Sequence, residues 1–260
     1  MLKRRIQTML ISELIKEMDV YPNWCDTVKF GNPDQEITGV VTTMWATPNV
    51  IRRAAELGAN LIITHEPTFY TDDDKPRDNS VERAKHELIQ KTGVVIYRYH
   101  TIMHMLKPDL IPTGAFYYLG LKGELTPTEH FASSIFTLEE PMSANELAAL
   151  FREKIGVKHI RIAGNGDFKG RTIGACFGMP AGVPEILADE KTDFVMVGEA
   201  CEYRQCEFAR DAAELGLNKA MIVLGHEGSE RSGMRYLAKL LSEKHPDLKI
   251  EYVECGEVYN

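Results

Sequence analysis

The stretch ITGVVTTMWATPNVIRRAAELGANLIITH, residues 37–65, decides the fold class. Its first part, residues 37–47, is an apolar run rich in β-branched residues and predicts a buried strand. Residues 48–58 predict a helix that begins at a proline and ends at a glycine, and residues 59–65 predict a second buried strand. Buried strands joined by a helix are typical of a mostly parallel sheet covered by helices.

The same alternation continues along the chain. Residues 81–92 predict a helix and residues 93–100 a third strand, which completes a βαβαβ unit. A segment rich in proline and glycine at 107–128 marks the predicted domain crossover. Beyond it, strands are predicted at 134–139, 159–163, 172–177, 193–198, 218–226 and 249–255, and helices at 143–156, 184–190, 202–215 and 229–243. The prediction is an α/β protein.

Composition limits the classes of function. The 260 residues carry 30 Lys and Arg against 38 Asp and Glu, a net charge of −8, which argues against a nucleic-acid backbone as the main partner. No apolar run approaches the roughly 20 residues needed to cross a bilayer. Residues 9–18 have an amphipathic pattern that predicts a packed helix rather than a signal peptide. The five scattered cysteines are typical of reduced thiols, so we expect a cytoplasmic protein.

Three histidines follow apolar runs directly. His65, His100 and His226 each end a predicted strand. In open parallel sheets the functional crevice lies outside the carboxyl ends of the strands, so we expect these imidazoles at one edge. His104 lies four residues after His100, and Glu230 lies four residues after His226, so a helical turn would place each pair on one face.

Histidine and carboxylate together indicate a metal site. Glu66 directly follows His65 and adds a second carboxylate. Imidazole with carboxylate suits Zn, Mn, Fe, Ni or Co, and a carboxylate can bridge two ions. Glu199 ends another predicted strand and is a further candidate for the crevice. No thiolate belongs to the set.

Each candidate also has a purely structural interpretation. His65 could hydrogen-bond to a backbone group, and His104 could be a satisfied core histidine between two methionines. Glu66 could be a solvated carboxylate or pair with Arg98. Glu199 could belong to a buried ion pair rather than to the crevice. These alternatives stay open at the level of the sequence.

Three segments together resemble the Nif-three-like family of dinuclear-metal-centre proteins, whose members are often catalogued as GTP cyclohydrolase I type 2 homologues. ANLIITHEP (59–67) is similar to a "GADLIITHHP" motif, and YRYHTIMHM (97–105) is similar to an "HTxxD" segment. The third segment begins at TDFVMVGE and ends at GHEGSE (192–230); it is similar to a motif that ends in "GHxxxE". The resemblance covers nearly the whole chain.

The resemblance implies two interlinked α/β lobes with mostly parallel sheets and a metal site at the strand carboxyl ends between them. We expect residues 1–125 plus 220–260 to form the first lobe and residues 126–219 to form the second. The family often assembles as a toroidal hexamer, so we expect a homo-oligomer, with no membrane partner.

The resemblance also assigns the ligands of two divalent ions. His65, His226 and Glu230 match metal-binding positions of the family, and Glu230 matches a bridging one. Glu66 stands where the family usually has a second histidine, and His104 stands where it has an aspartate. The ligand count is kept, so the two-metal site is still expected.

Two classes of function follow. The first is metal-assisted hydrolysis of a small phosphorylated or heterocyclic substrate, with His100 or Glu199 as general acid or base. GTP cyclohydrolase activity rests on the family resemblance alone. The second is a non-catalytic oligomer that binds metal or serves as a regulatory scaffold. The sequence does not decide between them.

Overall fold

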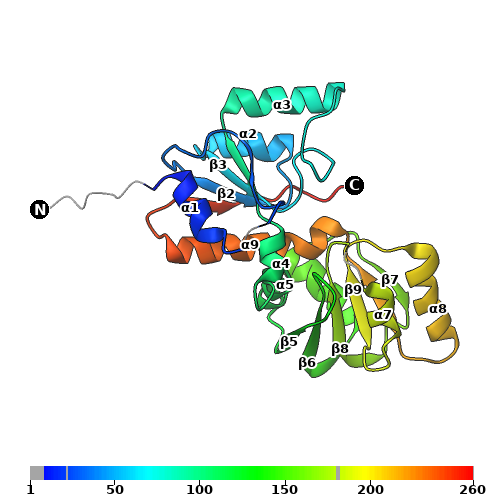
Figure 1. Cartoon of the computed structure of the whole chain (residues 1–260). Helices are drawn as coiled ribbons and strands as arrows, with labels where there is room; N and C mark the ends of the chain where they lie inside the picture. The colour runs from blue at the N-terminus through cyan, green and yellow to red at the C-terminus, as the bar shows by residue number, and fades with distance from the viewer. Residues whose placement is uncertain (1–8, 22, 180–181, 260) are drawn as a thin grey trace, which may run out of the picture. The chain divides into compact units, whose positions relative to one another are not determined.

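The computed structural model describes residues 9–21, 23–179 and 182–259 and divides into two compact units (Figure 1). Unit 1 consists of Met1–Met103 and Met234–Cys255, and unit 2 consists of His104–Gly233 and Gly256–Asn260. Five of the nine strand pairings between described residues are parallel. The predicted α/β fold with mostly parallel sheets is therefore confirmed.

Unit 1 contains a sheet of five strands among its described residues, in the order β1-β4-β3-β2-β11. All its pairings are parallel except that of β1 with β4. The strands span Val28–Phe30 (β1), Val40–Thr43 (β2), Leu61–Thr64 (β3), Val95–Arg98 (β4) and Ile250–Tyr252 (β11). Helix α1 spans Ile11–Met18, α2 Pro48–Glu56 and α3 Ser80–Thr92.

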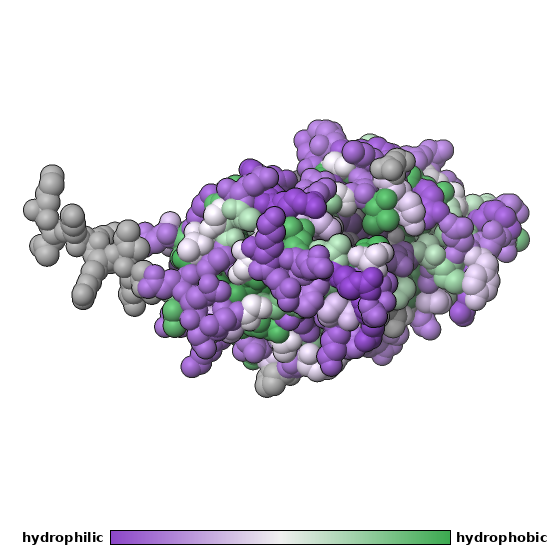
Figure 2. Space-filling view, turned by 90° about the horizontal axis from the view of Figure 1, so that it is seen from above, coloured by the Kyte–Doolittle hydropathy of each residue, from purple (hydrophilic) through white to green (hydrophobic). Residues whose placement is uncertain are grey.

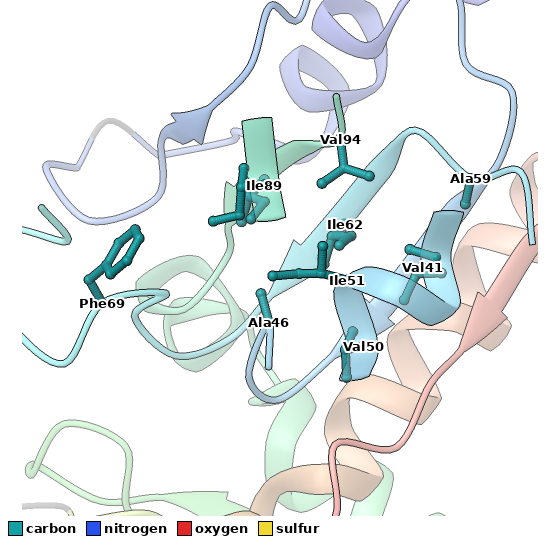
Figure 3. Packing of buried hydrophobic residues seen from close by; sticks show 11 residues of the cluster. Val41, Ala46, Val50, Ile51, Ala59, Ile62, Phe69, Ile89 and Val94 are labelled. Atoms are coloured by element: carbon teal, nitrogen blue, oxygen red, sulfur yellow. The ribbon is translucent and has the colours of Figure 1, made fainter. Parts of the chain in front are cut away.

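Hydrophobic side chains join this sheet to two of its helices. Helices α2 and α3 lie together on one side of the sheet, and the later turns of α9 (His226–Lys244) lie on the other (Figure 1). Val41 and Ile62 from neighbouring strands pack with Ile51 of α2 and Ile89 of α3 in one buried cluster (Figure 3). On the other side, the Thr42 hydroxyl donates a hydrogen bond to the Met234 carbonyl of α9, with 2.9 Å between the oxygens.

Unit 2 contains a sheet of six strands among its described residues, in the order β5-β6-β8-β9-β10-β7. Strands β8, β9 and β10 are parallel, and the outer pairings are antiparallel. The strands span Gly123–Pro127 (β5), Ser134–Ser143 (β6), Arg161–Gly164 (β7), Lys169–Cys176 (β8), Phe194–Val197 (β9) and Ala220–Val223 (β10). The three parallel strands thus form the centre of the sheet.

Helices cover both faces of this second sheet. Val195 and Met221 pack with Ile186 of α7 (Val183–Ala188) and Ala209 of α8 (Glu207–Glu214), and α6 (Ala144–Leu150) contacts β6 and β10. The predicted capping box of α6 is confirmed, because Ser143 Oγ accepts from the Glu146 backbone N–H and Glu146 accepts from the Ser143 N–H. Two π-helical turns, η1 (Phe151–Ile155) and η2 (Glu202–Cys206), complete the predicted helices 143–156 and 202–215.

Two helices lie directly before and within the predicted crossover at 107–128. Helix α4 spans Thr101–Met105 and α5 spans Leu110–Leu119. A Cβ atom on Gly114 of α5 would lie 2.6 Å from the Ser232 carbonyl oxygen of α9, so glycine permits this close approach of the two helices. Helix α5 was not predicted, nor were the short strands β1 and β5.

The compact units divide the chain at other residues than the predicted ranges. The sequence assigned residues up to 125, and again from 220, to the first lobe, whereas the observed divisions lie at 103/104 and 233/234. Strand β10 pairs with β9 and β7, so residues 220–223 belong with the second sheet. Strand β5 pairs with β6 and likewise ties the residues from 123 onward to unit 2.

Polar residues dominate the face of the molecule shown in Figure 2, with hydrophobic residues in small groups between them. Among the described residues, no helix combines the length and the apolar character that a membrane span requires.

Candidate metal centre

His65 is held in unit 1 directly after β3. Its side chain is fully buried, and its Nδ1 atom lies 3.1 Å from the Tyr99 carbonyl oxygen. A carbonyl oxygen can only accept a hydrogen bond, so Nδ1 carries the proton and Nε2 has the lone pair that a metal ion requires. Sequence analysis left open that such a backbone hydrogen bond has only a structural role. Here it also sets the tautomer in which Nε2 of His65 can bind a metal ion.

Glu66 is buried beside a cation. Its carboxylate lies 3.7 Å from the guanidinium Nη2 of Arg98 and 3.6 Å from Nε2 of His100. Arg98 is 4% exposed, so the pairing takes place away from bulk solvent. Of the alternatives left open by the sequence, the solvated carboxylate is wrong and the contact with Arg98 is observed. The contact partly neutralises the charge that Glu66 could offer to a metal ion.

His100 completes the group in unit 1. Its ring stacks on that of His65, with 4.5 Å between the centroids. The Asp26 carboxylate accepts hydrogen bonds from the backbone N–H groups of His100, Thr101 and Ile102, at 2.7 to 2.9 Å. Asp26 thus fixes the start of α4. Sequence analysis missed Asp26, because no local signal connects it to a segment more than 70 residues later.

In unit 2 two histidines converge on Glu230. His226 is the first residue of α9, and its Nε2 lies 3.3 Å from Glu230 Oε2, one helical turn later. His104 approaches from α4, with its Nε2 3.9 Å from Glu230 Oε1. The Glu230 side chain is 3% exposed. The expectation that His226 and Glu230 share one face of a helix is therefore confirmed.

A second carboxylate holds each of these histidines by its other nitrogen. Glu199 Oε1 lies 2.6 Å from Nδ1 of His226, and Asp109 Oδ2 lies 2.9 Å from Nδ1 of His104. A carboxylate can only accept a hydrogen bond, so the Nδ1 atom of each histidine carries the proton. The lone pair of each ring is then on Nε2, the nitrogen that faces Glu230. A neutral imidazole lone pair beside a carboxylate is unfavourable unless a proton or a metal ion lies between them. The arrangement therefore fits a cation.

Asp109 also begins a helix. Its other oxygen accepts from the backbone N–H of Ile111, which makes Asp109 the N-cap of α5. Sequence analysis missed it, although an aspartate directly before an apolar segment is an N-cap signal. Gly178 lies against the Glu230 carboxylate, and a Cβ atom on it would come within 2.6 Å of Oε1. Glycine therefore leaves room for the Glu230 side chain.

The structure brings the predicted site residues together in two sets. His65, Glu66 and His100 form the set of unit 1, and His104, Glu199, His226 and Glu230 form the set of unit 2. Buried or half-buried side chains that could hold a metal ion occur in both: His65, Glu66, His100, His104 and Glu230. Their nitrogen and oxygen donors suit Zn, Mn, Fe, Co or Ni better than Ca or Mg.

Comparisons with known proteins identify the family to which the chain belongs. The profile of the Duf34/NIF3 (NGG1p interacting factor 3) family matches residues 11–257. A protein of Clostridium perfringens (strain 13 / Type A) named GTP cyclohydrolase 1 type 2 homolog is 24% identical over 235 residues, which cover 87% of this chain and 86% of that protein. A protein of the same name from Escherichia coli (strain K12) is 22% identical over 223 residues, 85% of each chain.

Solved structures share the fold. A Bacillus cereus protein related to NIF3 superposes with a TM-score of 0.75 at 15% identity, covering 97% of this chain and 99% of that one. Reduced HcgD from Methanocaldococcus jannaschii superposes with a TM-score of 0.73 at 19% identity, covering 94% and 98%. The profile match contains every candidate ligand from His65 to Glu230, and the chain belongs to the Duf34/NIF3 family.

Proposed function

We propose that the chain is a metal-dependent hydrolase that binds two divalent ions through His65, Glu66, His104, His226 and Glu230. The convergence of His104 and His226 on the buried Glu230 carboxylate supports this most strongly. Assigning the ligands of both units to the same pair of ions is part of the proposal and follows from the sequence resemblance. Zn, Mn, Fe, Ni or Co would suit the donors.

Bound divalent ions would supply Lewis acidity and make a water molecule acidic enough to react near neutral pH. His100 would act as the general acid or base that transfers a proton to or from the substrate. Its Nε2 lies 3.6 Å from the Glu66 carboxylate, and its side chain is 23% exposed and so accessible to a substrate. For Glu199, the contact with His226 Nδ1 favours a positioning role over the acid-base role predicted from the sequence.

The substrate class is proposed from the relatives. Proteins named GTP cyclohydrolase 1 type 2 homolog are similar over most of the chain, which favours a small phosphorylated or heterocyclic substrate. We further propose that the protein works as a homo-oligomer, a hexamer, in the cytoplasm. Sedimentation equilibrium of the full chain would test the assembly.

One observation favours a second function, a non-catalytic metal-binding or scaffold protein. Arg98 pairs with Glu66 and adds a buried positive charge next to a proposed ligand. A fixed cation repels a divalent ion at the same carboxylate, which would weaken one of the two metal positions. A weakened position would harm two-metal catalysis more than it would harm a structural role.

Metal-dependent turnover distinguishes the two functions. The full chain would be reconstituted with Mn, Zn, Fe, Co or Ni and assayed on a panel of phosphomonoesters, nucleotides and heterocyclic amides. His226→Ala and Glu230→Gln should lower turnover by roughly 100-fold or more. Glu243→Gln is the matched control, because Glu243 lies on the same helix, is 60% exposed and pairs with Lys239 on the surface.

A hydrolase should therefore show turnover that depends on the added metal and survives in the Glu243→Gln variant. The proposal fails if the metal-loaded protein turns over no substrate of the panel while His226→Ala changes the oligomeric state. That result would support the scaffold function.

A further inference from the structure

Unit 2 contains a large cavity lined by residues of α5, β5 and β6. Its volume is about 1190 Å³, which is large enough for a ring-containing small molecule. Phe116 and Phe136 form part of its lining and stack face to face, with 3.8 Å between the ring centroids. Each ring is 4% exposed, so the pair forms a packed aromatic part of the cavity lining.

Apolar side chains around this cavity are exposed to an unusual degree. Met105, Tyr117 and Phe131 all line it, and their exposed fractions are 42%, 52% and 50%. Large apolar groups gathered around a concavity are typical of a ligand-binding site rather than of ordinary surface. The charged residues of the lining, Lys107 and Glu124 among them, have no positive excess that would favour a phosphate here.

The cavity reaches a proposed metal ligand. His104 is part of its lining, and the Phe131 ring meets the His104 ring edge-on, with 5.5 Å between the centroids. A ring bound beside Phe131 would therefore lie next to the imidazole whose Nε2 faces Glu230. The contact between Phe131 and His104 therefore joins the apolar cavity to the proposed metal ligands.

We propose that this cavity binds a planar aromatic or heteroaromatic ring of the substrate, with the group to be hydrolysed attached to that ring and placed at His104. The inference rests on the proposed hydrolase function and narrows its substrate class to ring-bearing molecules. Phosphate or another polar group would be bound at the metal ligands, outside the apolar cavity.

Three probes distinguish binding of a ring in the cavity from binding of phosphate at the metal ligands. In calorimetry, 1-naphthol is titrated into chelator-treated protein, inorganic phosphate into metal-loaded protein, and 1-naphthyl phosphate into metal-loaded protein. Phe131→Ala should weaken the binding of 1-naphthol and 1-naphthyl phosphate by roughly fivefold or more and leave that of phosphate unchanged. Tyr203→Ala is the control, because Tyr203 is 78% exposed and does not line the cavity.

The outcomes of the three titrations are distinguishable. If 1-naphthol binds wild type and Phe131→Ala equally, or does not bind, the ring subsite is refuted even when metal and phosphate bind normally. If 1-naphthol binding depends on Phe131 but phosphate does not bind the metal-loaded protein, the cavity stands as a ring-binding site and the hydrolase proposal loses support. Equal affinities for 1-naphthyl phosphate and phosphate would also overturn the inference.

Discussion

Three histidines of the candidate site are oriented by the same kind of hydrogen bond, from Nδ1 to an oxygen atom. A carbonyl or carboxylate oxygen holds Nδ1 of His65, His104 and His226, which leaves Nε2 as the nitrogen that can bind a cation. These partners lie outside the proposed ligand set, yet they decide which nitrogen has the lone pair. Metal affinity should therefore depend on residues that need not touch the metal.

Asp109→Asn tests this dependence at His104. The asparagine oxygen can still accept from Ile111 N–H and cap α5, but an amide that donates to Nδ1 would invert the imidazole tautomer. We expect metal affinity to fall by about 10- to 100-fold with little loss of stability. Competition against a chelator measures the affinity, and Asp109→Ala, which loses the cap as well, serves as the comparison. Unchanged affinity in Asp109→Asn would refute the tautomer argument.

Lys85, on helix α3, gives a second residue-scale prediction. Its Nζ donates to the Thr68 carbonyl, and burial lowers the pKa of Lys85 from 10.5 to about 8, opposed by the charges of Asp74 and Glu82. Between these two pKa values the unfolded chain binds more protons than the folded one. The free energy of unfolding should therefore rise with pH across this window, by roughly 3 kcal/mol at most.

Urea unfolding from about pH 7 to about pH 10.5 would measure this contribution in wild type, Lys85→Met and Lys91→Met. The difference between wild type and Lys85→Met should grow with pH, because methionine cannot titrate. Lys91 is exposed on the same helix, so Lys91→Met should follow wild type. Parallel curves for wild type and Lys85→Met would contradict the burial argument.

At the scale of elements, apolar runs and helix caps predicted most of the fold. Strands β2, β3, β4, β9 and β10 lie within the predicted runs, because β-branched residues fill buried positions on both faces of a parallel sheet. Helix α5 was missed because Pro112 and Gly114 read as breakers. Pro112 falls in the first turn, where no intrahelical N–H bond is lost, and Gly114 is needed for contact with α9.

The variant Gly114→Ala tests whether the contact between α5 and α9 requires glycine at this position. Alanine favours a helix over glycine by about 0.5–1 kcal/mol, so propensity alone predicts a more stable protein. A Cβ atom 2.6 Å from the Ser232 carbonyl oxygen and 2.9 Å from Gly233 Cα predicts the opposite, a loss of roughly 1–3 kcal/mol. Thermal unfolding of the metal-free variant decides between the two. An increase in stability would show that α5 and α9 do not need this approach.

At the scale of the whole molecule, the chain distributes its candidate ligands over two compact units. The ligands are proposed from sequence motifs; in the structure His65 and Glu66 directly follow β3, His104 lies in α4, and His226 and Glu230 lie in the first turns of α9. The motifs could not find Asp26, because its contact with the His100 backbone depends on how distant segments pack. Asp109 carries a local N-cap signal that was overlooked, and the pairing of Glu66 with Arg98 was one of two alternatives that the sequence left open. The positive charge of Arg98 beside Glu66 weakens the electrostatic attraction of a divalent ion to this carboxylate.

The number of ions bound per chain tests the central claim most directly. Elemental mass spectrometry would be run on tag-free protein purified without chelators, with Glu230→Gln beside it and Glu243→Gln as the control. We predict about two divalent ions per chain in wild type and the control, and their loss in Glu230→Gln, because Glu230 faces both His104 and His226. One ion or fewer in wild type, even after reconstitution with Mn, Zn, Fe and Ni, would contradict the two-metal hydrolase.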